Sequence, residues 1–157
     1  MQTPLILLKN PIFTSMNFSG KYICTLQYGE GYSLQHKNGE LTFQMEIEEA
    51  DNLFSGSALD IKGIGISPYK ARVTGLINGI HIEFDKIYEK RHADDGNGNT
   101  VFENKEGFPI LYEGTYNDDT GYYEGKWKYN VVRRFLFFFS WPINVGSGTF
   151  RLKKRED

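Results

Sequence analysis

Residues 41–48 read Leu-Thr-Phe-Gln-Met-Glu-Ile-Glu, an uninterrupted alternation of apolar and polar side chains. A β-strand points successive side chains to opposite faces of its sheet, so this stretch predicts a strand with one apolar and one polar face. The alternation recurs at 80–85 (IHIEFD) and, less regularly, at 22–27 (YICTLQ). Half-buried strands that follow one another without a helical segment are typical of an antiparallel sandwich or barrel.

Turn signals divide the chain into eight main strands. Asn-Gly pairs at 38–39 and 78–79 favour hairpin turns, and a polar loop covers 94–99. The predicted strands are 19–28, 41–49, 52–60, 70–77, 80–90, 109–117, 121–130 and 146–154. Because closing a sheet removes its edge strands, sequential hairpins predict an all-β, antiparallel up-and-down β-barrel, with a sandwich as the alternative.

Length and composition narrow the class of protein. At 157 residues with 39% hydrophobic and 24% charged residues, the chain is expected to form a single domain over 1–157, with 1–17 as an irregular lead-in. A net charge of −2 disfavours a nucleic-acid partner. The sequence has neither a secretory signal pattern nor a run of about 20 apolar residues, so a cytoplasmic location is expected. The single cysteine, Cys24, excludes an intrachain disulfide.

Short motifs near both ends of the chain match a known family. Residues 18–22 (FSGKY) correspond to a Gly-x-Trp strand opening with Tyr22 in place of tryptophan. Trp141 followed by 145–150 (VGSGTF) corresponds to a tryptophan plus V-G-x-x-T-F, and 54–56 (FSG) to an inner-strand F/L-T-G. These motifs resemble the avidin and streptavidin family of calycin-type barrels. The resemblance implies the same small β-barrel.

The resemblance does not extend to the biotin site. In that family, polar first-strand groups and an acidic residue bind the ureido group of biotin. The matching positions here are Cys24, Tyr28 and Gly148. A site built on hydrogen bonds loses most of its affinity when its partners are absent, so biotin binding is not expected.

The alternating strands also predict which side chains face the barrel interior. The inward apolar residues are Leu41, Phe43, Met45, Ile47, Ile80, Ile82 and Phe84. Continuing this phase brings Lys86 and Tyr88 inside, and the inward phase of the third strand ends at Asp60. An inward lysine is costly unless it is paired, and Asp60 is the candidate partner.

Lys86 has two interpretations. It forms a ligand-anchoring pair with Asp60 at a barrel mouth, or its strand bends or ends near Asp85 and lets Lys86 reach water, which is the favoured interpretation. A catalytic lysine ranks lower, because no second acid or base accompanies it at a fixed spacing. The predicted ligand-binding residues add aromatic inward positions of later strands; they are Asp60, Lys86, Tyr88, Tyr112 and Trp127.

Residues 95–106 nearly fit a calcium-binding loop. Asp95, Asn97 and Asn99 stand at positions one, three and five, and Glu106 stands at position twelve. Thr100 occupies position six, where the sharp turn requires glycine, and the flanks lack helices. A plain hairpin loop uses the same residue types, and it is the favoured interpretation. No cofactor is expected, with calcium as the alternative.

Residues 133–141 (RRFLFFFSW) form an aromatic segment that cannot all face one barrel interior. Arginine and aromatic residues are enriched in subunit interfaces, so the segment predicts either a homo-oligomer interface or a flap over a barrel end. A membrane-surface loop ranks below both. The predicted interface residues are Phe135, Phe137, Phe138, Phe139 and Trp141.

Three functions follow, in this order. The first is non-enzymatic binding of a small, largely apolar ligand inside the barrel. The second is a protein interaction module with a filled barrel that acts through 133–141. The third is an enzyme that uses the Asp60 and Lys86 region.

Overall fold

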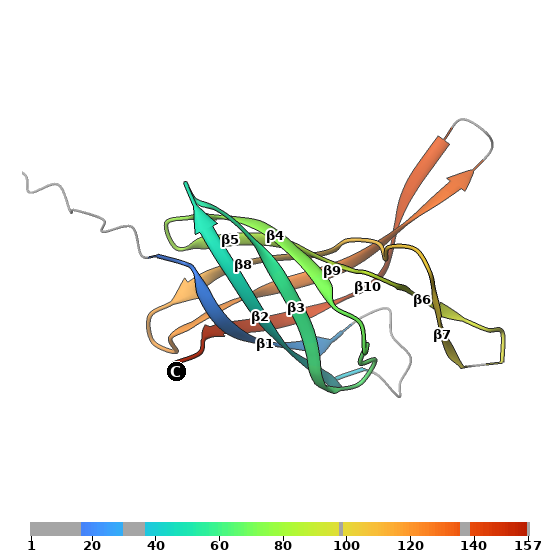
Figure 1. Cartoon of the computed structure of the whole chain (residues 1–157), viewed down its shortest axis with the longest axis horizontal. Coiled ribbons are helices and arrows are strands. Elements are labelled where there is room, and N and C mark those ends of the chain that lie inside the picture. Colours follow the sequence, from blue (N-terminus) through green and yellow to red (C-terminus); the bar gives the residue numbers. More distant parts are fainter. Residues whose placement is uncertain (1–16, 30–36, 98, 136–138, 157) are drawn as a thin grey trace, which may run out of the picture.

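The computed structural model describes residues 17–29, 37–97, 99–135 and 139–156. These residues form a closed antiparallel barrel in which the strand order is β1-β10-β9-β8-β5-β4-β3-β2 (Figure 1). The barrel strands are β1 (Gly20–Tyr28), β2 (Glu40–Ala50), β3 (Leu53–Gly63), β4 (Ala71–Asn78), β5 (His81–Tyr88), β8 (Ile110–Asn117), β9 (Tyr122–Phe135) and β10 (Phe139–Lys154). Each strand pairs with the next barrel strand along the chain, and β10 closes onto β1. The predicted up-and-down barrel is confirmed.

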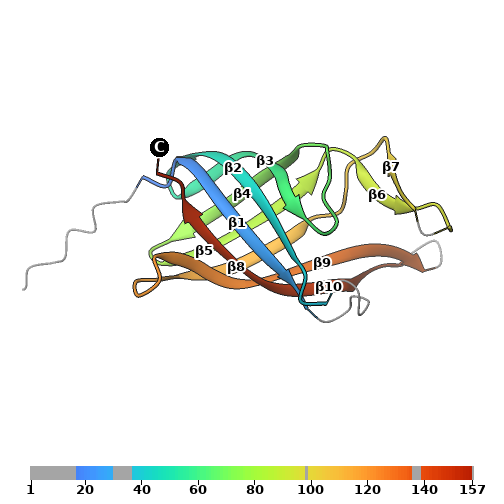
Figure 2. The ribbon, with the colours of Figure 1, turned by 90° about the horizontal axis from the view of Figure 1, so that it is seen from below.

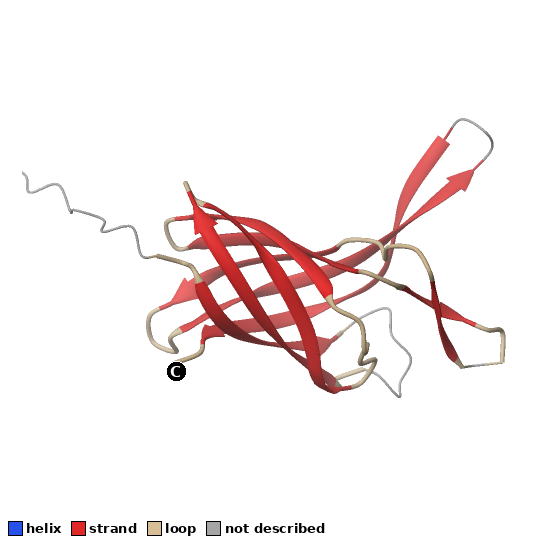
Figure 3. Ribbon diagram, viewed as in Figure 1, coloured by secondary structure: helices blue, strands red, loops and turns tan. Residues whose placement is uncertain are grey.

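A small hairpin interrupts the barrel order between β5 and β8. It consists of β6 (Arg91–Asp94) and β7 (Thr100–Glu103), which pair only with each other and stand beside the barrel (Figures 1 and 2). The sequence predicted one strand over 80–90 followed by a loop, but β5 ends at Tyr88 and the predicted loop is the tip of this hairpin. Among the described residues all regular structure is strand (Figure 3), and no helix there could cross a membrane.

The inward phase predicted from alternation is confirmed on the barrel strands. Cys24, Phe43, Met45, Ile82 and Leu152 have no measurable exposure and form part of one continuous core. Ile80 is the exception, because it lies in the turn between β4 and β5 and is 61% exposed.

Two-residue turns set the register of two hairpins. Asp51 and Asn52 both have positive φ between the paired residues Ala50 and Leu53, which is the geometry of a type I′ turn. The Asn-Gly pair at 78–79 does not itself form the two-residue turn. Asn78 pairs with His81, so the turn is Gly79-Ile80, and only Gly79 (φ 60°) has positive φ, as in type II′.

An aromatic cluster fills one end of the barrel. The Phe18 ring packs 4.7 Å from Tyr22, 4.9 Å from Phe54 and 5.6 Å from Tyr123, measured between centroids. The Tyr22 hydroxyl donates to the Phe18 carbonyl at 2.9 Å, which fixes the segment before β1 across the interior. This end is therefore closed, and the opposite end, beside β6 and β7, is the mouth.

The strands β9 and β10 extend beyond the barrel as a paired arm. Their register runs from Tyr123↔Leu152 out to Phe135↔Phe139, with an irregularity between Asn144 and Gly146. Figures 1 and 2 show the arm projecting from the barrel. The sequence predicted strands that ended at 130 and began at 146, because the apolar run and Pro142 hide the alternation.

Candidate ligand site at the barrel mouth

Asp60, Lys86 and Tyr88 meet inside the barrel, in agreement with the inward phase of their strands. The Lys86 Nζ lies 3.3 Å from Asp60 Oδ1 and donates to the Tyr88 hydroxyl oxygen at 2.8 Å. The Tyr88 hydroxyl in turn donates to Asp60 Oδ2 at 2.7 Å. The side chains of Lys86 and Asp60 are 0% and 1% exposed. The alternation of β3 and β5 therefore carries through to these polar residues without a bend.

The side chains of Asp60, Lys86 and Tyr88 satisfy one another's hydrogen-bonding groups in a low-dielectric interior. The backbone N–H of Ser67 donates to Asp60 Oδ2 at 2.9 Å, and the Lys86 ammonium lies 3.8 Å from the centroid of the Phe43 ring. Burial lowers the pKa of Lys86, and the neighbouring Asp60 opposes this shift. Burial and the Asp60 charge both raise the pKa of Tyr88, so its hydroxyl keeps its proton.

The favoured interpretation, in which Lys86 reaches water, is therefore wrong. The strand β5 continues past Asp85 to Tyr88, and the Lys86 side chain is completely enclosed. The charged groups lie below the mouth, and Tyr88 connects them to it. The pair therefore holds one aromatic ring of the mouth in place through its hydroxyl.

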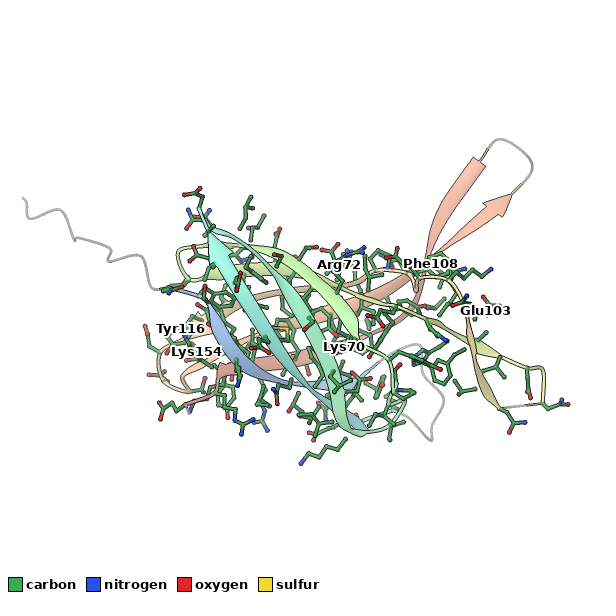
Figure 4. All side chains as sticks on the ribbon, viewed as in Figure 1. Lys70, Arg72, Glu103, Phe108, Tyr116 and Lys154 are labelled. Carbon is green, nitrogen blue, oxygen red and sulfur yellow. The ribbon has the colours of Figure 1, made fainter. Side chains whose placement is uncertain are left out.

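A cavity of about 350 Å³ occupies the mouth. Aromatic and aliphatic side chains dominate its wall. The lining residues are Leu26, Tyr28, Leu41, Gly65, Tyr88, Lys90, His92, Gly107, Phe108, Ile110, Trp127, Tyr129 and Val145. Figure 4 places Phe108 at the end of the barrel beside β6 and β7, and Tyr116 at the opposite end. The volume lies near the lower limit of small-molecule sites.

Hydrogen bonds hold two aromatic walls of the cavity. The Tyr28 hydroxyl donates to the Ile64 carbonyl at 2.7 Å, and Trp127 Nε1 donates to the Gln27 carbonyl at 3.1 Å. The two rings meet edge to face with centroids 5.7 Å apart. These contacts give the cavity a preformed wall on β1 and β9.

His92 contributes a buried ring nitrogen to the cavity wall. Its ring lies between Tyr88 and Phe102, with centroids 5.1 Å and 4.9 Å away. Its Nε2 is buried and has no hydrogen-bond partner among the described residues. Buried polar atoms without hydrogen-bond partners are uncommon, so we expect Nε2 to bind a group that is not among the described residues.

Tyr112 does not line the cavity. It stacks on Phe84 with centroids 4.4 Å apart and meets Phe150 edge to face at 5.3 Å, in the middle of the barrel. Its buried hydroxyl also has no partner among the described residues. Of the five predicted ligand-binding residues, Tyr88 and Trp127 therefore line the cavity, whereas Asp60 and Lys86 lie behind Tyr88.

The predicted calcium-loop residues lie at the two ends of the β6–β7 hairpin. At the tip, the Asp95 carboxylate accepts the backbone N–H groups of Asn97 and Asn99 and the Asn99 side-chain amide. These hydrogen bonds lower the pKa of Asp95. Glu106 follows the base of the hairpin, where its carboxylate binds Arg72 Nη1 at 2.8 Å. The structure does not bring Asp95 and Glu106 together, and calcium binding stays a prediction.

A separate group of side chains of metal-ligating types lies on the outer wall. Nε2 of His81 is 3.2 Å from a Glu83 carboxylate oxygen and 3.8 Å from one of Glu113. The three ligand atoms lie within 4.8 Å of one another. The sequence could not predict this group, because β5 and β8 pair across the inserted hairpin.

The predicted interface residues lie on the arm. Phe135 pairs in register with Phe139, and Trp141 pairs with Arg133. Phe137 and Phe138 lie outside the described residues. An interface through this segment stays a prediction.

Sequence reasoning missed Lys90, His92 and Phe108. All three lie between β5 and β8, where the alternation stops. Their position at the mouth depends on how the β6–β7 segment folds back toward the barrel, and no local pattern indicates that path. Each of the three side chains is only partly buried, so a periodic pattern of buried positions does not indicate them.

The comparisons with known proteins give no relative. No protein-family model matches the sequence, and no curated protein or solved structure is significantly similar to it. The closed eight-stranded barrel agrees with a calycin-like fold. Gly148 has no room for a side chain. A side chain at this position would collide with the Gln27 carbonyl and would come within 2.7 Å of Trp127 Nε1.

Proposed function

We propose that this barrel binds a small, largely apolar ligand in the cavity at its mouth. The observation that carries the proposal is the cavity of about 350 Å³ lined by aromatic side chains. Ligand sites in small barrels occupy such mouths and combine apolar walls with a few polar groups. The opposite end is filled by the Phe18 cluster, so a ligand enters and leaves through the mouth.

The wall residues have distinct roles in this function. Trp127 and Tyr28 form a rigid aromatic wall, because their polar atoms are bonded to the backbone. Tyr88 forms the floor, and the buried Asp60 and Lys86 fix its orientation. A wall that is ordered before binding reduces the entropy that binding must overcome.

A matched pair of tryptophan substitutions tests the proposal. Ile110 lines the cavity, whereas the next residue, Leu111, lies on the outer wall and is 36% exposed. The probe is N-phenyl-1-naphthylamine, a neutral fluorophore whose emission rises in apolar surroundings. We expect saturable binding to the native protein and to Leu111→Trp, and binding weakened roughly tenfold or more by Ile110→Trp, which fills the cavity.

The opposite results overturn the proposal. If the native protein gives no saturable signal up to the solubility of the probe, the mouth is not a site for apolar ligands. If Ile110→Trp and Leu111→Trp bind equally, the probe lies elsewhere. Far-ultraviolet circular dichroism of both variants shows whether the barrel is intact.

A second candidate function uses the β9–β10 arm. The paired strands project from the barrel, and the described residues 133–135 and 139–141 of the aromatic segment pair with one another in their outer part. Aromatic residues next to arginine are enriched in protein interfaces. We propose that the arm mediates association with a second copy of the chain.

A further inference from the structure

We propose that the ligand of the mouth carries an anionic group, and that Lys90 and His92 bind this group. The inference rests on the proposed function and adds the chemical class of the ligand. It is an apolar, preferably aromatic acid, with its ring system between Trp127 and Tyr88 and its charged group toward the β6–β7 hairpin.

The first argument is the charge of the cavity wall. Its described lining residues include the basic side chains Lys90 and His92 and contain no aspartate or glutamate. The buried carboxylate of Asp60 lies behind Tyr88, where Lys86, Tyr88 and the Ser67 N–H already satisfy it. A cationic ligand would therefore find aromatic rings but no carboxylate in this wall, whereas an anionic ligand would find two basic side chains.

The second argument is the unpartnered nitrogen of His92. Nε2 is buried in the cavity wall, and no described residue accepts or donates a hydrogen bond there. Tyr88 and Phe102 hold the ring from two sides, so it cannot turn freely toward water. A carboxylate or sulfonate oxygen in the cavity would accept a hydrogen bond from the Nε2–H group and remove the cost of leaving this atom unpaired.

The third argument is the set of cations around the rim. The Lys90 ammonium lies 4.6 Å from the centroid of the Tyr69 ring, and the Arg91 guanidinium lies 4.0 Å from that of Phe108, a lining residue. Within the described part of the chain, neither Lys90 nor Arg91 forms an ion pair with a carboxylate. Two of the nearby carboxylates are engaged, because Glu106 pairs with Arg72 and Glu103 pairs with Lys105. The exposed Glu89 precedes Lys90 in the sequence but is not a lining residue. The rim therefore offers the ammonium of Lys90 and the guanidinium of Arg91 to an entering anion.

Two probes with one aromatic body separate this inference from the proposed function. The first probe, 1-anilinonaphthalene-8-sulfonate, is N-phenyl-1-naphthylamine with an added sulfonate. We expect the anionic probe to bind roughly tenfold tighter than the neutral one at low salt. Raising the ionic strength to about 0.5 M should reduce this ratio, because rim charges are screened.

Substitutions of Lys90 and His92 test whether these side chains bind the charged group of the ligand. Lys90→Gln and His92→Gln should each weaken the sulfonate probe roughly threefold to tenfold and change the neutral probe less than about twofold. Lys21→Gln is the control, because Lys21 is an exposed residue at the closed end of the barrel. The Lys90 ammonium contacts the Tyr69 ring but forms no hydrogen bond to a described side chain. We therefore expect Lys90→Gln to keep the fold even if His92→Gln loosens the hairpin.

The outcomes are distinguishable. If both probes bind the cavity with equal affinity, or if Lys90→Gln weakens both equally, the anionic ligand is wrong and the apolar site stands. If neither probe binds, or if Ile110→Trp weakens neither, the proposed function itself is wrong. Preference for the sulfonate that is lost in Lys90→Gln and kept in Lys21→Gln confirms the inference.

Discussion

The Tyr88 hydroxyl donates a 2.7 Å hydrogen bond to the buried Asp60 carboxylate, although the Tyr88 ring lines the mouth cavity. It also accepts a hydrogen bond from the Lys86 ammonium at 2.8 Å. A neutral phenol thus lies between two opposite charges that have no contact with solvent. The electrostatics of the barrel interior and the shape of the mouth therefore depend on the same side chain.

Breaking the buried pair should destabilise the barrel strongly. Lys86→Met leaves the Asp60 carboxylate buried without its cation, which costs about 3 to 5 kcal/mol of unfolding free energy. Combining Lys86→Met with Asp60→Asn removes both charges, so we expect the double variant to recover more than half of the loss. Urea unfolding followed by tryptophan fluorescence measures all three proteins. A double variant as unstable as Lys86→Met would contradict the assigned pairing.

Gly148 should tolerate no side chain. Gly148→Ala places a methyl group against the Gln27 carbonyl and 2.7 Å from Trp127 Nε1. We expect a loss of about 1 to 3 kcal/mol in unfolding free energy and a shift of the Trp127 emission, because its hydrogen bond to Gln27 is disturbed. Ser147→Ala, one residue away, is the control and should change neither quantity. Equal stability of the two variants would be the opposing result.

Cys24 should be unreactive in the folded protein. It faces the interior with 0% exposure, and burial raises the pKa of its thiol, so both access and the reactive thiolate are lacking. We expect no labelling by iodoacetamide at pH 8 in native buffer and a single label in concentrated urea, as measured by intact mass. Rapid labelling in native buffer would show that the interior is open near β1.

His92 should make the unliganded protein less stable in mild acid. Burial lowers the pKa of its imidazole below the ordinary value of 6.5; Asp60 opposes this shift and Lys86 adds to it. The unfolded chain therefore binds more protons in the window just below pH 6.5, and stability falls as the pH decreases through it. The ring is only half-buried, so the contribution stays below about 1 kcal/mol.

Comparison with His92→Gln isolates this contribution. We expect the difference in unfolding free energy between the native protein and the variant to be constant above pH 7 and to shrink between pH 6.5 and 5. Urea titrations at each pH measure it. A difference that grows as the pH falls would mean that the folded protein favours the protonated imidazole.

The arm should determine the association state. Replacing Phe137 and Phe138 by serine should convert an oligomer to a monomer, because the substitutions remove apolar contact area from the proposed interface. Leu53→Ser is the control, since Leu53 is an exposed apolar residue far from the arm. Size-exclusion chromatography with light scattering measures the mass. A native protein that is monomeric at all concentrations would contradict the proposed interface.

The parity of alternating strands predicted the barrel and the inward phase of the buried polar group, although an end of the strand near Asp85 that would have released Lys86 to water was favoured. Once Phe43 and Phe84 were placed inside, Lys86 and Tyr88 followed from the two-residue repeat, and Asp60 from the same rule on β3. The prediction failed where side-chain direction is not periodic. Ile80 points outward because a two-residue turn interrupts the phase, and Lys90, His92 and Phe108 reach the mouth through an irregular insertion.

Non-local pairing explains the remaining differences. The group of His81, Glu83 and Glu113 exists because β5 pairs with β8 across 89–109, and no sequence spacing encodes that pairing. Strands β9 and β10 were predicted too short because their outer parts pair with each other without an alternating pattern.

The pairing of β10 with β1 also has a consequence for biosynthesis. Tyr22 is the partner of Lys154, and Tyr28 is the partner of Gly148. The first barrel strand can therefore complete its pairing only after the last strand has been synthesised. A ribosome delivers β1 early, and that strand keeps an open edge until almost the whole described chain has been translated. The nascent barrel is therefore most exposed to edge-to-edge aggregation during synthesis, and a chaperone would protect it by covering β1.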